Sequence, residues 1–350
     1  MAGDTRRICA RAQEEGGRTV TKVLGIESSC DETAVAIVED GHHLLATSLT
    51  SSAQIHALYG GVVPEVAARE HAMAIMPVLD SVLAHSRLSL SKIDGVAVTQ
   101  GPGLLGALLV GVTFAKSLAA ALNIPVVGVH HLQAHLYANA LEESLHFPAL
   151  ALLVSGGHTS LLLWRNYLQW EVLGETRDDA AGEAFDKGAR ILGLAYPGGP
   201  EIERLAKRAA KKSLRLPVAD MAGTLDFSFS GVKTAAKSLW QAHRDEPEEV
   251  AYALQDAVIK ALMKNIERAL ARYDVKQIYV AGGVSANRAL RDALRHLGMV
   301  RNINMSIPRI EYCTDNAAMV AALGYYRLRE GQTMGGFEGP RPLWPLATVR

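Results

Sequence analysis

The chain has 350 residues, 49% of them hydrophobic, and a formal net charge of zero. This length and apolar content support one large core or two smaller ones, and they favour two domains. The balanced charge excludes a protein whose whole surface binds nucleic acid, so any such contact must be a local basic patch. The widely spaced cysteines Cys9, Cys30 and Cys313 exclude a disulfide framework and predict free thiols in a reducing, cytoplasmic compartment.

Neither the N-terminal segment nor the most apolar stretch predicts a targeting or membrane segment. Residues 1–22 mix arginines with acidic residues and have no apolar core, which is typical of a flexible extension and not of a secretory signal or an acid-poor transit peptide. The most apolar stretch starts at Leu104. Lys116 interrupts it, and Asn123 and Pro125 end it too early for a membrane span. We therefore expect a buried helix followed by a buried strand, and no membrane contact.

The first half of the chain begins with three apolar runs rich in β-branched residues and separated by short polar turns, which predict antiparallel strands. These runs are 22–29, 34–40 and 44–51. Pro64 is well placed to open a helix, and apolar positions recur at helical spacing as far as Leu83. A strand then follows at 94–100 and a helix from Gly103. A second strand follows at 125–131 and a second helix from Leu132.

The second half repeats this order of elements. Three strands are expected at 148–155, 160–166 and 167–175, and a strand, a Gly-rich turn and a helix follow from Lys276. The repetition indicates an internal duplication of an α/β unit. We predict a duplicated actin-like, two-lobed α/β fold of the kind shared by actin, sugar kinases and heat-shock ATPases (the ASKHA class, ribonuclease H-like). Two unrelated α/β domains remain the alternative.

This fold prediction implies four segments. They are an N-terminal extension at 1–22, an N-terminal lobe at 23–145, a C-terminal lobe at 146–333 and an irregular tail at 334–350. The stretch 175–245 is rich in charge, glycine and helical signals, and it contains the segment FSFSGVKTA. We expect it to be a helical insertion in the second lobe that packs over the cleft between the halves.

His131 and His135 stand four residues apart directly after a predicted buried strand. On a helix this spacing places both imidazoles on one face, one turn apart, as two ligands of one ion require. The loop EYCTDNAAM near the end of the second half adds a carboxylate at Asp315. Two histidines and one carboxylate favour Fe²⁺ or Zn²⁺ and leave coordination positions open. The alternative for Asp315 is a plain helix N-cap, which Thr314 or Asn316 could equally supply.

Gly-rich turns follow two predicted strands. In VSGGHT, Val154 to Thr159, two glycines let a phosphate approach backbone amides closely, and His158 is placed to contact a phosphate or a metal-bound group. An ordinary hairpin turn is the alternative. In AGGVSAN, Ala281 to Asn287, the helix start can bind an anion or a purine edge, or it can simply be capped.

Three further sets of charged residues are candidates for chemistry or binding. Asp186 could accept both hydroxyls of a ribose, although its surroundings also fit a solvated helix. Asp31 and Glu32, in the first polar turn SSCDET, could orient a nucleophile or a metal-bound water. The basic strip, as we call the third set, could contact nucleic-acid phosphates or be a solvated face. It consists of Arg204, Lys207, Arg208, Lys211, Lys212 and Arg215.

Taken together and in order, nine segments closely resemble the bacterial TsaD family, relatives of the catalytic subunit of the archaeal and eukaryotic KEOPS complex. These segments are GIESSCDETAVAIV, YGGVVPEVAAREH, TQGPGLLGALLVG, HHLQAHLYA, LLVSGGHT, GEAFDKGARILGL with its following YPGGP, FSFSGVKTA, AGGVSAN and CTDNAAM. The resemblance implies the actin-like duplicated fold. It also implies transfer of a threonylcarbamoyl group from threonylcarbamoyl-AMP to N6 of adenosine 37 in tRNAs that read ANN codons.

The resemblance also implies roles for individual residues. The implied metal ligands are His131, His135 and Asp315. The acyl-phosphate is implied to contact the strand and turn formed by Leu153, Val154, Ser155, Gly156 and Gly157. The nucleoside of an adenylate (threonylcarbamoyl-AMP, or ATP, ADP or AMP) is implied to contact Asp186, Gly199, Asn287 and, less directly, Glu203. One departure lies between the two histidines, where relatives often have Glu and this chain has Gln133.

The partners implied by the resemblance are tRNA, the inactive paralogue TsaB and the ATPase TsaE, with TsaB docking on the helices from Pro64 and Gly103. A different class of function remains to be separated from this one, namely an ATP-dependent kinase or chaperone-type ATPase of the same fold. Such a protein would need an acid beside Mg²⁺ and would not need the histidine pair. The chain has no GxxxxGK[ST] phosphate loop and no HExxH zinc protease motif.

Overall fold

The computed structural model describes residues 21–59, 61–221 and 223–346. The predicted extension at 1–22 therefore lies outside the described residues except for its last two positions, as do Cys9 and the end of the predicted tail. The chain divides into two compact units. In the described residues, unit 1 comprises 21–145 with 315–346, and unit 2 comprises 146–314.

Unit 1 contains a five-stranded sheet with the order β3-β2-β1-β4-β5. Its strands are β1 (Lys22–Glu27), β2 (Glu32–Glu39), β3 (His43–Ser51), β4 (Gly95–Gly101) and β5 (Val126–His130). β1 to β3 are antiparallel neighbours, whereas β1, β4 and β5 run parallel. Every residue of β4 is buried, as expected for a parallel strand with helices on both faces.

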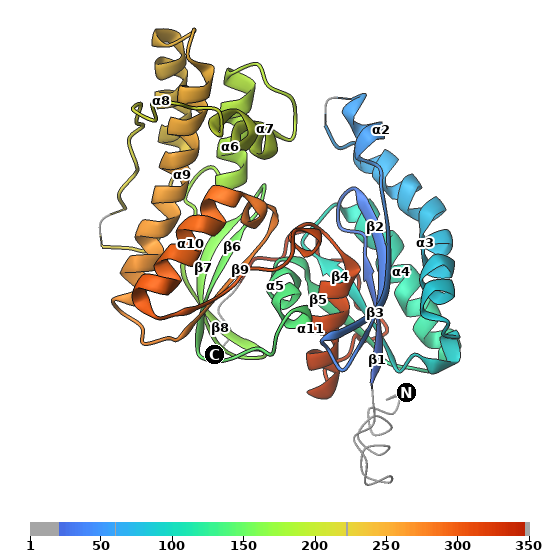
Figure 1. Ribbon diagram of the computed structural model, residues 1–350. Coiled ribbons are helices and arrows are strands. Elements are labelled where there is room, and N and C mark those ends of the chain that lie inside the picture. The colour runs from blue at the N-terminus through green and yellow to red at the C-terminus, as the bar shows by residue number, and fades with distance from the viewer. Residues whose placement is uncertain (1–20, 60, 222, 347–350) are drawn as a thin grey trace. The chain divides into compact units, whose positions relative to one another are not determined.

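Two long helices, α3 (Pro64–Ser86) and α4 (Leu105–Leu122), cover one face of this sheet, and α11 (Ala317–Arg329) lies on β1 and β4 (Figure 1). The remaining helical segments of unit 1 are short. They are α2 (Ala53–Ala57), η1 (Leu90–Lys92), α5 (His131–Tyr137) and η2 (Ala138–Leu141). Pro64 occupies the first position of α3, where its missing N–H leaves no hydrogen bond unmade.

Helix α11 belongs to unit 1, whereas the sequence prediction assigned everything from 146 to 333 to the second lobe. The physical reason is close packing against β1. A Cβ atom added at Gly25 would lie 2.3 Å from the carbonyl oxygen of Ala317. The glycine thus lets the helix backbone sit directly on the strand, and the chain returns to unit 1 immediately before it.

Unit 2 contains a second five-stranded sheet with the order β10-β9-β6-β7-β8. Its strands are β6 (Ala149–Val154), β7 (Thr159–Asn166), β8 (Gln169–Glu175), β9 (Gln277–Ala281) and β10 (Asn304–Ser306). β6 to β8 are antiparallel, and β6, β9 and β10 are parallel. Read from the opposite edge, this is the topology of unit 1. The predicted duplication is confirmed.

The helices of unit 2 share one large apolar core with its sheet. They are α6 (Ala181–Ile191), α7 (Gly198–Ala206), α8 (Ser230–Ala242), α9 (Pro247–Leu270), η3 (Gly283–Ala286), α10 (Arg288–Arg301) and η4 (Ile310–Tyr312). The stretch predicted as a helical insertion, 175–245, supplies α6, α7 and α8, each of which packs against α9. Asp178 fixes the FSFSGVKTA segment, because its carboxylate accepts hydrogen bonds from Ser228, Phe229 and Ser230.

Helix α4 is long and apolar enough to cross a membrane by length and composition alone, the one such helix among the described residues. It packs against α3 and β4 with one face, but only 33% of it is buried, so the prediction of a buried helix holds for that face alone. The tail that follows α11 also belongs to unit 1. It lies along the ends of β4 and β5, where Arg341 donates its backbone N–H to Gln100 and His130 Nε2 lies 2.9 Å from the carbonyl oxygen of Trp344.

Candidate metal centre and phosphate-binding turns

Helix α5 begins where the parallel strand β5 ends. His130 is the N-cap of this helix, and its Nδ1 atom accepts a hydrogen bond from the backbone N–H of Leu132. The helix then places His131 and His135 on consecutive turns, with ring centroids 4.8 Å apart and an interplanar angle of 80°. The predicted geometry of this pair, with both rings on one helix face, is confirmed.

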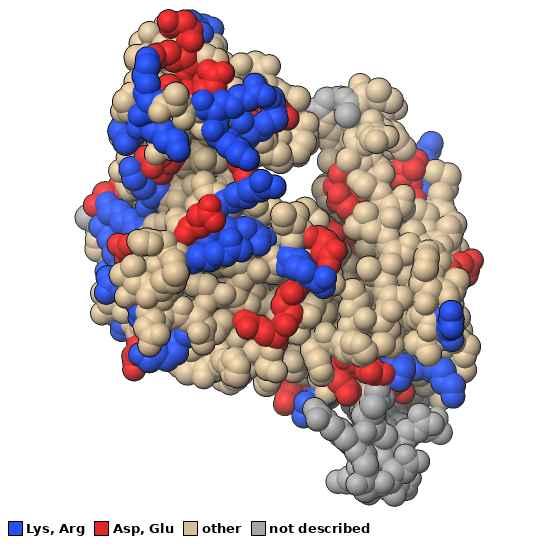
Figure 2. Space-filling model, in the orientation of Figure 1, with Lys and Arg blue, Asp and Glu red and all other residues tan. Residues whose placement is uncertain are grey.

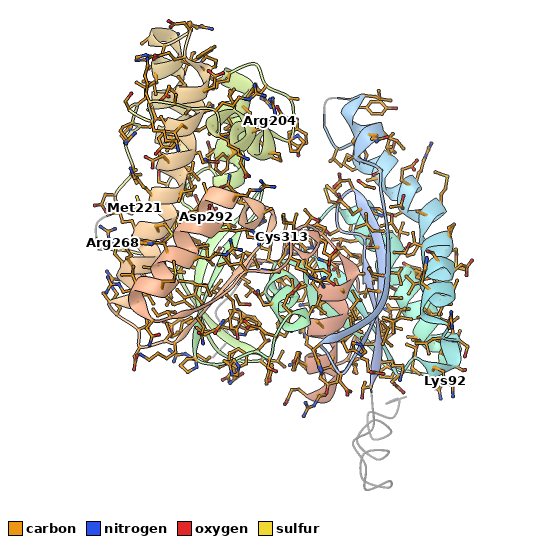
Figure 3. All side chains as sticks on the ribbon, in the orientation of Figure 1. Lys92, Arg204, Met221, Arg268, Asp292 and Cys313 are labelled. Carbon is orange, nitrogen blue, oxygen red and sulfur yellow. The ribbon has the colours of Figure 1, made fainter. Side chains whose placement is uncertain are left out.

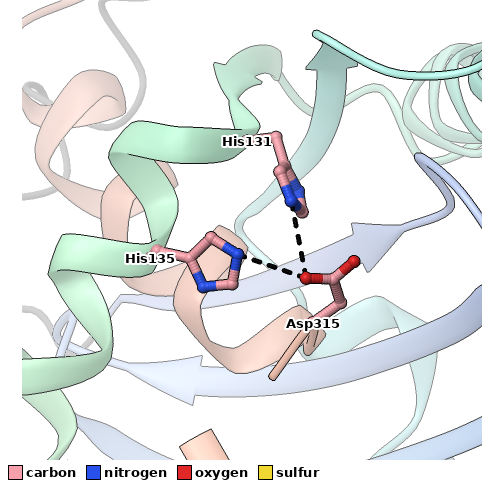
Figure 4. Close-up of side chains that lie close together, drawn as sticks. All are labelled: His131, His135 and Asp315. Carbon is pink, nitrogen blue, oxygen red and sulfur yellow. Dashed lines mark ion pairs between the residues drawn. The ribbon is translucent and has the colours of Figure 1, made fainter. Parts of the chain in front are cut away.

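Asp315 lies directly opposite the two imidazoles (Figure 4). Its Oδ1 atom is 3.2 Å from His135 Nε2 and 3.5 Å from His131 Nε2. The N-cap of α11 is the neighbouring Asn316, whose side chain accepts a hydrogen bond from the backbone N–H of Met319. The capping alternative is therefore wrong for Asp315, and its carboxylate is free to face the histidines.

The charges of this cluster are strongly interdependent. Burial raises the pKa of Asp315, but the attraction of His131 and the hydrogen bonds to both histidines outweigh it and hold that pKa far below its usual range. Burial likewise lowers the pKa of His131, yet the negative charges of Asp315 and Glu27 raise it well above its usual value. The carboxylates thus favour a positive charge between them, which a proton or a metal ion can supply.

The donor set fits a divalent metal ion. The ligand atoms of His131, His135 and Asp315 all lie within 4.8 Å of one another, and both histidines present Nε2 to the same point. Two imidazoles and one carboxylate leave further coordination positions open for a substrate or water. This arrangement lies wholly within unit 1.

Glu27, which sequence reasoning missed, lies behind the histidines. It ends β1, is fully buried, and its Oε2 atom is 3.1 Å from His131 Nδ1. Its oxygens also accept hydrogen bonds from the backbone N–H of Ser29, at 2.7 Å, and from Thr99 Oγ1, at 2.6 Å. The available signal was a single glutamate at the end of a run of buried apolar residues, a position where carboxylates are rare unless paired.

Asp31 and Glu32, the predicted catalytic acids, follow shortly after β1. Burial and a hydrogen bond with Asp31 raise the pKa of Glu32 to about 9, and the nearby charge of Asp315 acts in the same direction. At neutral pH Glu32 therefore carries a proton and can donate a hydrogen bond. This protonation suits a general acid and disfavours Glu32 as a general base at neutral pH.

Three predicted motifs, VSGGHT, GEAFDKGARILGL and AGGVSAN, meet at the carboxyl ends of β6 and β9 in unit 2. Leu153 and Val154 are buried in β6. Two hydrogen bonds close the turn after them: the Ser155 N–H donates to the His158 carbonyl, and the His158 N–H donates to Ser155 Oγ. A Cβ atom added at Gly182, in the first turn of α6, would lie 2.6 Å from the Ser155 carbonyl oxygen. Gly282 approaches the carbonyl of Val154 just as closely.

The two exposed glycines of that turn, Gly156 and Gly157, have no atom within 4 Å of an added Cβ among the described residues. The backbone of Gly156 lies beside Gly182 in the first turn of α6, and the N-terminus of a helix carries a partial positive charge. Exposed glycine amides beside a helix N-terminus are groups that can bind an anion. His158 is the last residue of the turn.

The other predicted nucleoside contacts are already engaged within unit 2. Asp186 accepts a hydrogen bond from the backbone N–H of Gly198, and Glu203 accepts one from that of Arg288. Asn287 caps α10 and donates to Gln255 Oε1, so it has the structural role that the capping alternative described. Gly199, in the first turn of α7, is open to approach.

Comparison with known proteins identifies the fold class first. The chain superposes on HypF from T. kodakarensis with a TM-score of 0.63 and 15% identity, covering 90% of this chain and 48% of that one. The Acidaminococcus fermentans (R)-2-hydroxyglutaryl-CoA dehydratase component A gives 0.52 and 16%, over 88% of this chain and 99% of that one. The fold is thus the duplicated actin-like fold that the sequence predicted.

The sequence comparisons then identify the family. Residues 43–322 match TsaD, tRNA N6-adenosine threonylcarbamoyltransferase. Enzymes of that name are 49% identical in Carboxydothermus hydrogenoformans, over 89% of this chain and 93% of the relative, and 48% identical in Bacillus subtilis, over 88% and 91%. The Legionella pneumophila relative is 47% identical over 93% and 99%. The chain belongs to the tRNA N6-adenosine threonylcarbamoyltransferase family.

Proposed function

We propose that this protein transfers the threonylcarbamoyl group from threonylcarbamoyl-AMP to N6 of adenosine 37 in tRNAs that read ANN codons, forming N6-threonylcarbamoyladenosine. Its family is that of an acyltransferase acting on tRNA. The observation that carries the proposal is the cluster of His131, His135 and Asp315 at the end of β5. An ATPase of this fold would need an acid beside Mg²⁺ and would not need two imidazoles facing one carboxylate.

The proposed cofactor is one divalent metal ion per chain, Fe²⁺ in the first place and Zn²⁺ as the alternative. Both suit a set of two imidazoles and one carboxylate. When bound, such an ion supplies Lewis-acid chemistry toward the carbamoyl carbonyl or the phosphate of the mixed anhydride. His131, His135 and Asp315 would hold it, and the rigid helix α5 would fix the two nitrogen ligands one turn apart.

The proposed adenylate site is the cluster of turns in unit 2. The amides of Gly156 and Gly157 and the N-terminus of α6 would bind the phosphate and stabilise negative charge that develops on it during transfer. Gly199 offers open backbone to the nucleoside. Asp186, Glu203 and Asn287 would contribute by exchanging a present hydrogen bond for one to the nucleoside.

The acid-base roles divide between Asp31 and Glu32. The adenosine amine must lose a proton as its nitrogen attacks, and AMP must leave. We assign the base to Asp31. Glu32, which is protonated at neutral pH, would stabilise the developing charge as a hydrogen-bond donor.

The proposed tRNA surface is the basic strip. Figure 2 shows Lys and Arg gathered over part of unit 2, and Figure 3 labels Arg204 on α7, where the strip begins. Three of its cations pair with acidic neighbours, namely Arg204 with Glu201, Lys211 with Glu246, and Arg215 with Asp256. Lys207 and Arg208 are exposed at the end of α7. The zero net charge of the chain makes such a local patch the expected form of a tRNA contact.

TsaB is the proposed partner of the outer surface of α3 and α4, the helices that begin at Pro64 and after Gly103. Large apolar side chains are exposed there, and the set consists of Met73, Met76, Leu105 and Leu109. Apolar side chains gathered on neighbouring helices are typical of a protein interface. TsaE is proposed as a further partner.

The proposed location is the cytoplasm, without membrane contact. A tRNA substrate and the free thiols of Cys30 and Cys313 support it.

The function is tested by incubating metal-loaded protein with threonylcarbamoyl-AMP and unmodified tRNA, with and without TsaB and TsaE, and analysing the nucleosides by mass. The modified nucleoside should form with the wild type and not with His131→Ala. Hydrolysis of ATP without nucleoside modification, under all partner combinations, would instead indicate the kinase or chaperone class. Full activity and full metal content in His131→Ala would refute the role of the cluster.

A further inference from the structure

Glu27 occupies a position that the transfer reaction does not directly explain. Its side chain is fully buried, and a buried carboxylate is costly unless its oxygens are hydrogen-bonded and its charge is balanced. Two donors are already present, the backbone N–H of Ser29 and the hydroxyl of Thr99. The remaining neighbour is Nδ1 of His131, at 3.1 Å from Oε2.

These contacts determine which nitrogen of His131 carries the proton. The Ser29 backbone N–H can only donate, and an ionised carboxylate can only accept. The backbone N–H of Ser29 and the hydroxyl of Thr99 donate to different oxygens of Glu27, which is the hydrogen-bonding pattern of an ionised carboxylate. Because Nδ1 of His131 faces this carboxylate, it donates its N–H there, and the hydroxyl of Ser29, 3.3 Å from the same nitrogen, can accept as well. The nitrogen left for a metal ion is Nε2, once the ion has displaced any proton on it. Nε2 is the atom that faces Asp315.

The second histidine lacks this support. Nδ1 of His135 is buried and has no hydrogen-bond partner among the described residues. The two imidazoles both face Asp315 through Nε2 but are unequal at Nδ1, because that nitrogen of His131 faces a carboxylate and that of His135 does not. Removing the carboxylate behind His131 should change that histidine alone.

We propose that Glu27 is a positioning residue, which holds His131 in the tautomer with Nδ1 protonated and thereby strengthens metal binding at Nε2. A carboxylate behind a ligating histidine fixes its ring and raises its basicity, and its loss typically lowers metal affinity 10- to 100-fold. Ser29 and Thr99 in turn fix the carboxylate. This inference rests on the metal centre of the proposed function.

The test is a titration of metal-free protein with Co²⁺, followed by its visible absorption, and with Zn²⁺ in competition with a chelator. Glu27→Gln keeps the shape of the side chain and removes the charge. In one orientation of the glutamine amide, its NH₂ group meets the Ser29 N–H, and two donors face each other. In the other orientation, the NH₂ group meets His131 Nδ1 and favours the tautomer with the proton on Nε2, which cannot bind metal through that atom. We expect affinity to fall by roughly 10- to 100-fold, with a changed Co²⁺ spectrum.

Glu39→Gln is the matched control. Glu39 lies on β2, opposite Lys22 in the same hairpin, and forms an ion pair with that lysine at 3.1 Å. Its substitution removes the same charge from the same sheet, so metal affinity should stay at the wild-type value. Circular dichroism and thermal unfolding of the metal-free proteins establish that each variant is folded.

The outcomes separate this inference from the metal centre itself. Failure of the wild type to bind Co²⁺ or Zn²⁺, or equal binding by His131→Ala, overturns the metal centre. If the wild type binds metal, His131→Ala does not, and Glu27→Gln has the wild-type affinity and spectrum, then only the role of Glu27 is overturned. A purely structural role for Glu27 would lower the unfolding temperature and leave the affinity of the folded protein unchanged.

A second measurement on the wild type keeps the inference testable if Glu27→Gln does not fold. In zinc-loaded protein labelled with ¹⁵N-histidine, nuclear magnetic resonance distinguishes protonated from metal-bound ring nitrogens, and His131→Gln assigns the signals. We expect a protonated Nδ1 and a zinc-bound Nε2 for His131. A zinc-bound or unprotonated Nδ1 would overturn the proposal.

Discussion

Nε2 of His135 lies 3.2 Å from Oδ1 of Asp315, and the two residues come from segments far apart in the sequence. Helix α5 supplies the histidine, and the residue that precedes the N-cap of α11 supplies the carboxylate. The two helices are held together because α11 packs both on β1 and against α5. The metal centre that we propose therefore depends on how closely α11 approaches the sheet.

Asp315→Asn should reduce metal content sharply without unfolding the chain. The amide keeps the shape of the side chain but loses the negative charge that attracts both a cation and a protonated His131. We expect metal per chain to fall below about one tenth of the wild-type value, in line with the loss of one of three ligands. Elemental analysis after dialysis measures it.

Glu311→Gln is the control for this prediction. Glu311 is exposed, pairs with Arg309 and lies four residues from the ligand, so its loss should leave metal content unchanged. An Asp315→Asn protein with one firmly bound metal ion would show that the carboxylate is not a ligand.

Glu32→Gln should stabilise the protein increasingly as pH rises. The pKa of Glu32 is raised to about 9, so between pH 5 and 9 the folded state binds more protons than the unfolded state. The wild type therefore loses stability over that interval, and the glutamine variant has no such proton to lose. We expect the variant to gain more than about 1 kcal/mol relative to the wild type from pH 5 to 8.

Urea unfolding of metal-free protein at several pH values measures this difference. Glu39→Gln again serves as control, because an ion pair with Lys22 lowers the pKa of Glu39 and its loss gives no gain at high pH. A difference between Glu32→Gln and the wild type that does not change with pH would contradict the assignment of a proton to Glu32.

Gly25→Ala should destabilise unit 1. The added methyl group would meet the Ala317 carbonyl oxygen at 2.3 Å and the Ala321 nitrogen at 2.7 Å, so α11 must move outward. Overpacking of this kind typically costs about 1–3 kcal/mol. Because Asp315 precedes α11, metal affinity should fall as well. Gly61→Ala is the matched control, since no atom lies within 4 Å of its added Cβ among the described residues.

Thermal unfolding and metal titration of both glycine variants decide the point. The expected result is a lower unfolding temperature and weaker metal binding in Gly25→Ala only. If Gly25→Ala matched Gly61→Ala in both measurements, α11 would not be fixed against β1 in the manner that the structure indicates.

Much of the fold was predictable because its signals are local. The β-branched runs of β1 and β2, Pro64 at the start of α3 and the repeated order of elements each follow from neighbouring residues. The assignment of α11 to unit 1 was not predictable in this way. It depends on Gly25 meeting Ala317, a contact between residues distant in sequence that no spacing rule encodes.

The candidate site divides in the same way. The spacing of His131 and His135 encodes their shared face, whereas the choice between Asp315 and Asn316 as helix cap depends on which side chain the loop turns toward the backbone. Glu27 was missed because its partner His131 is remote in sequence and only strand pairing brings Thr99 beside it. For Asn287, the capping alternative describes what the structure shows.

The last prediction concerns tRNA. Lys207 and Arg208 are exposed at the C-terminal end of α7, and a double Lys207→Ala, Arg208→Ala variant should weaken tRNA binding. If both cations contact phosphates, affinity for all tRNAs should fall together and the slope of log K against log salt should decrease by about 1–2. Metal content should not change, because both residues lie in unit 2 and the metal cluster lies in unit 1.

Lys276→Ala is the matched control for the double variant, because Lys276 is an exposed cation of unit 2 that pairs with Asp274 and lies outside the basic strip. Binding is measured by fluorescence anisotropy with labelled tRNA at several salt concentrations, so that slopes and not single affinities are compared. If the double variant kept the wild-type slope while retaining its metal, the basic strip would be a solvated face, and the tRNA surface would have to involve other cations.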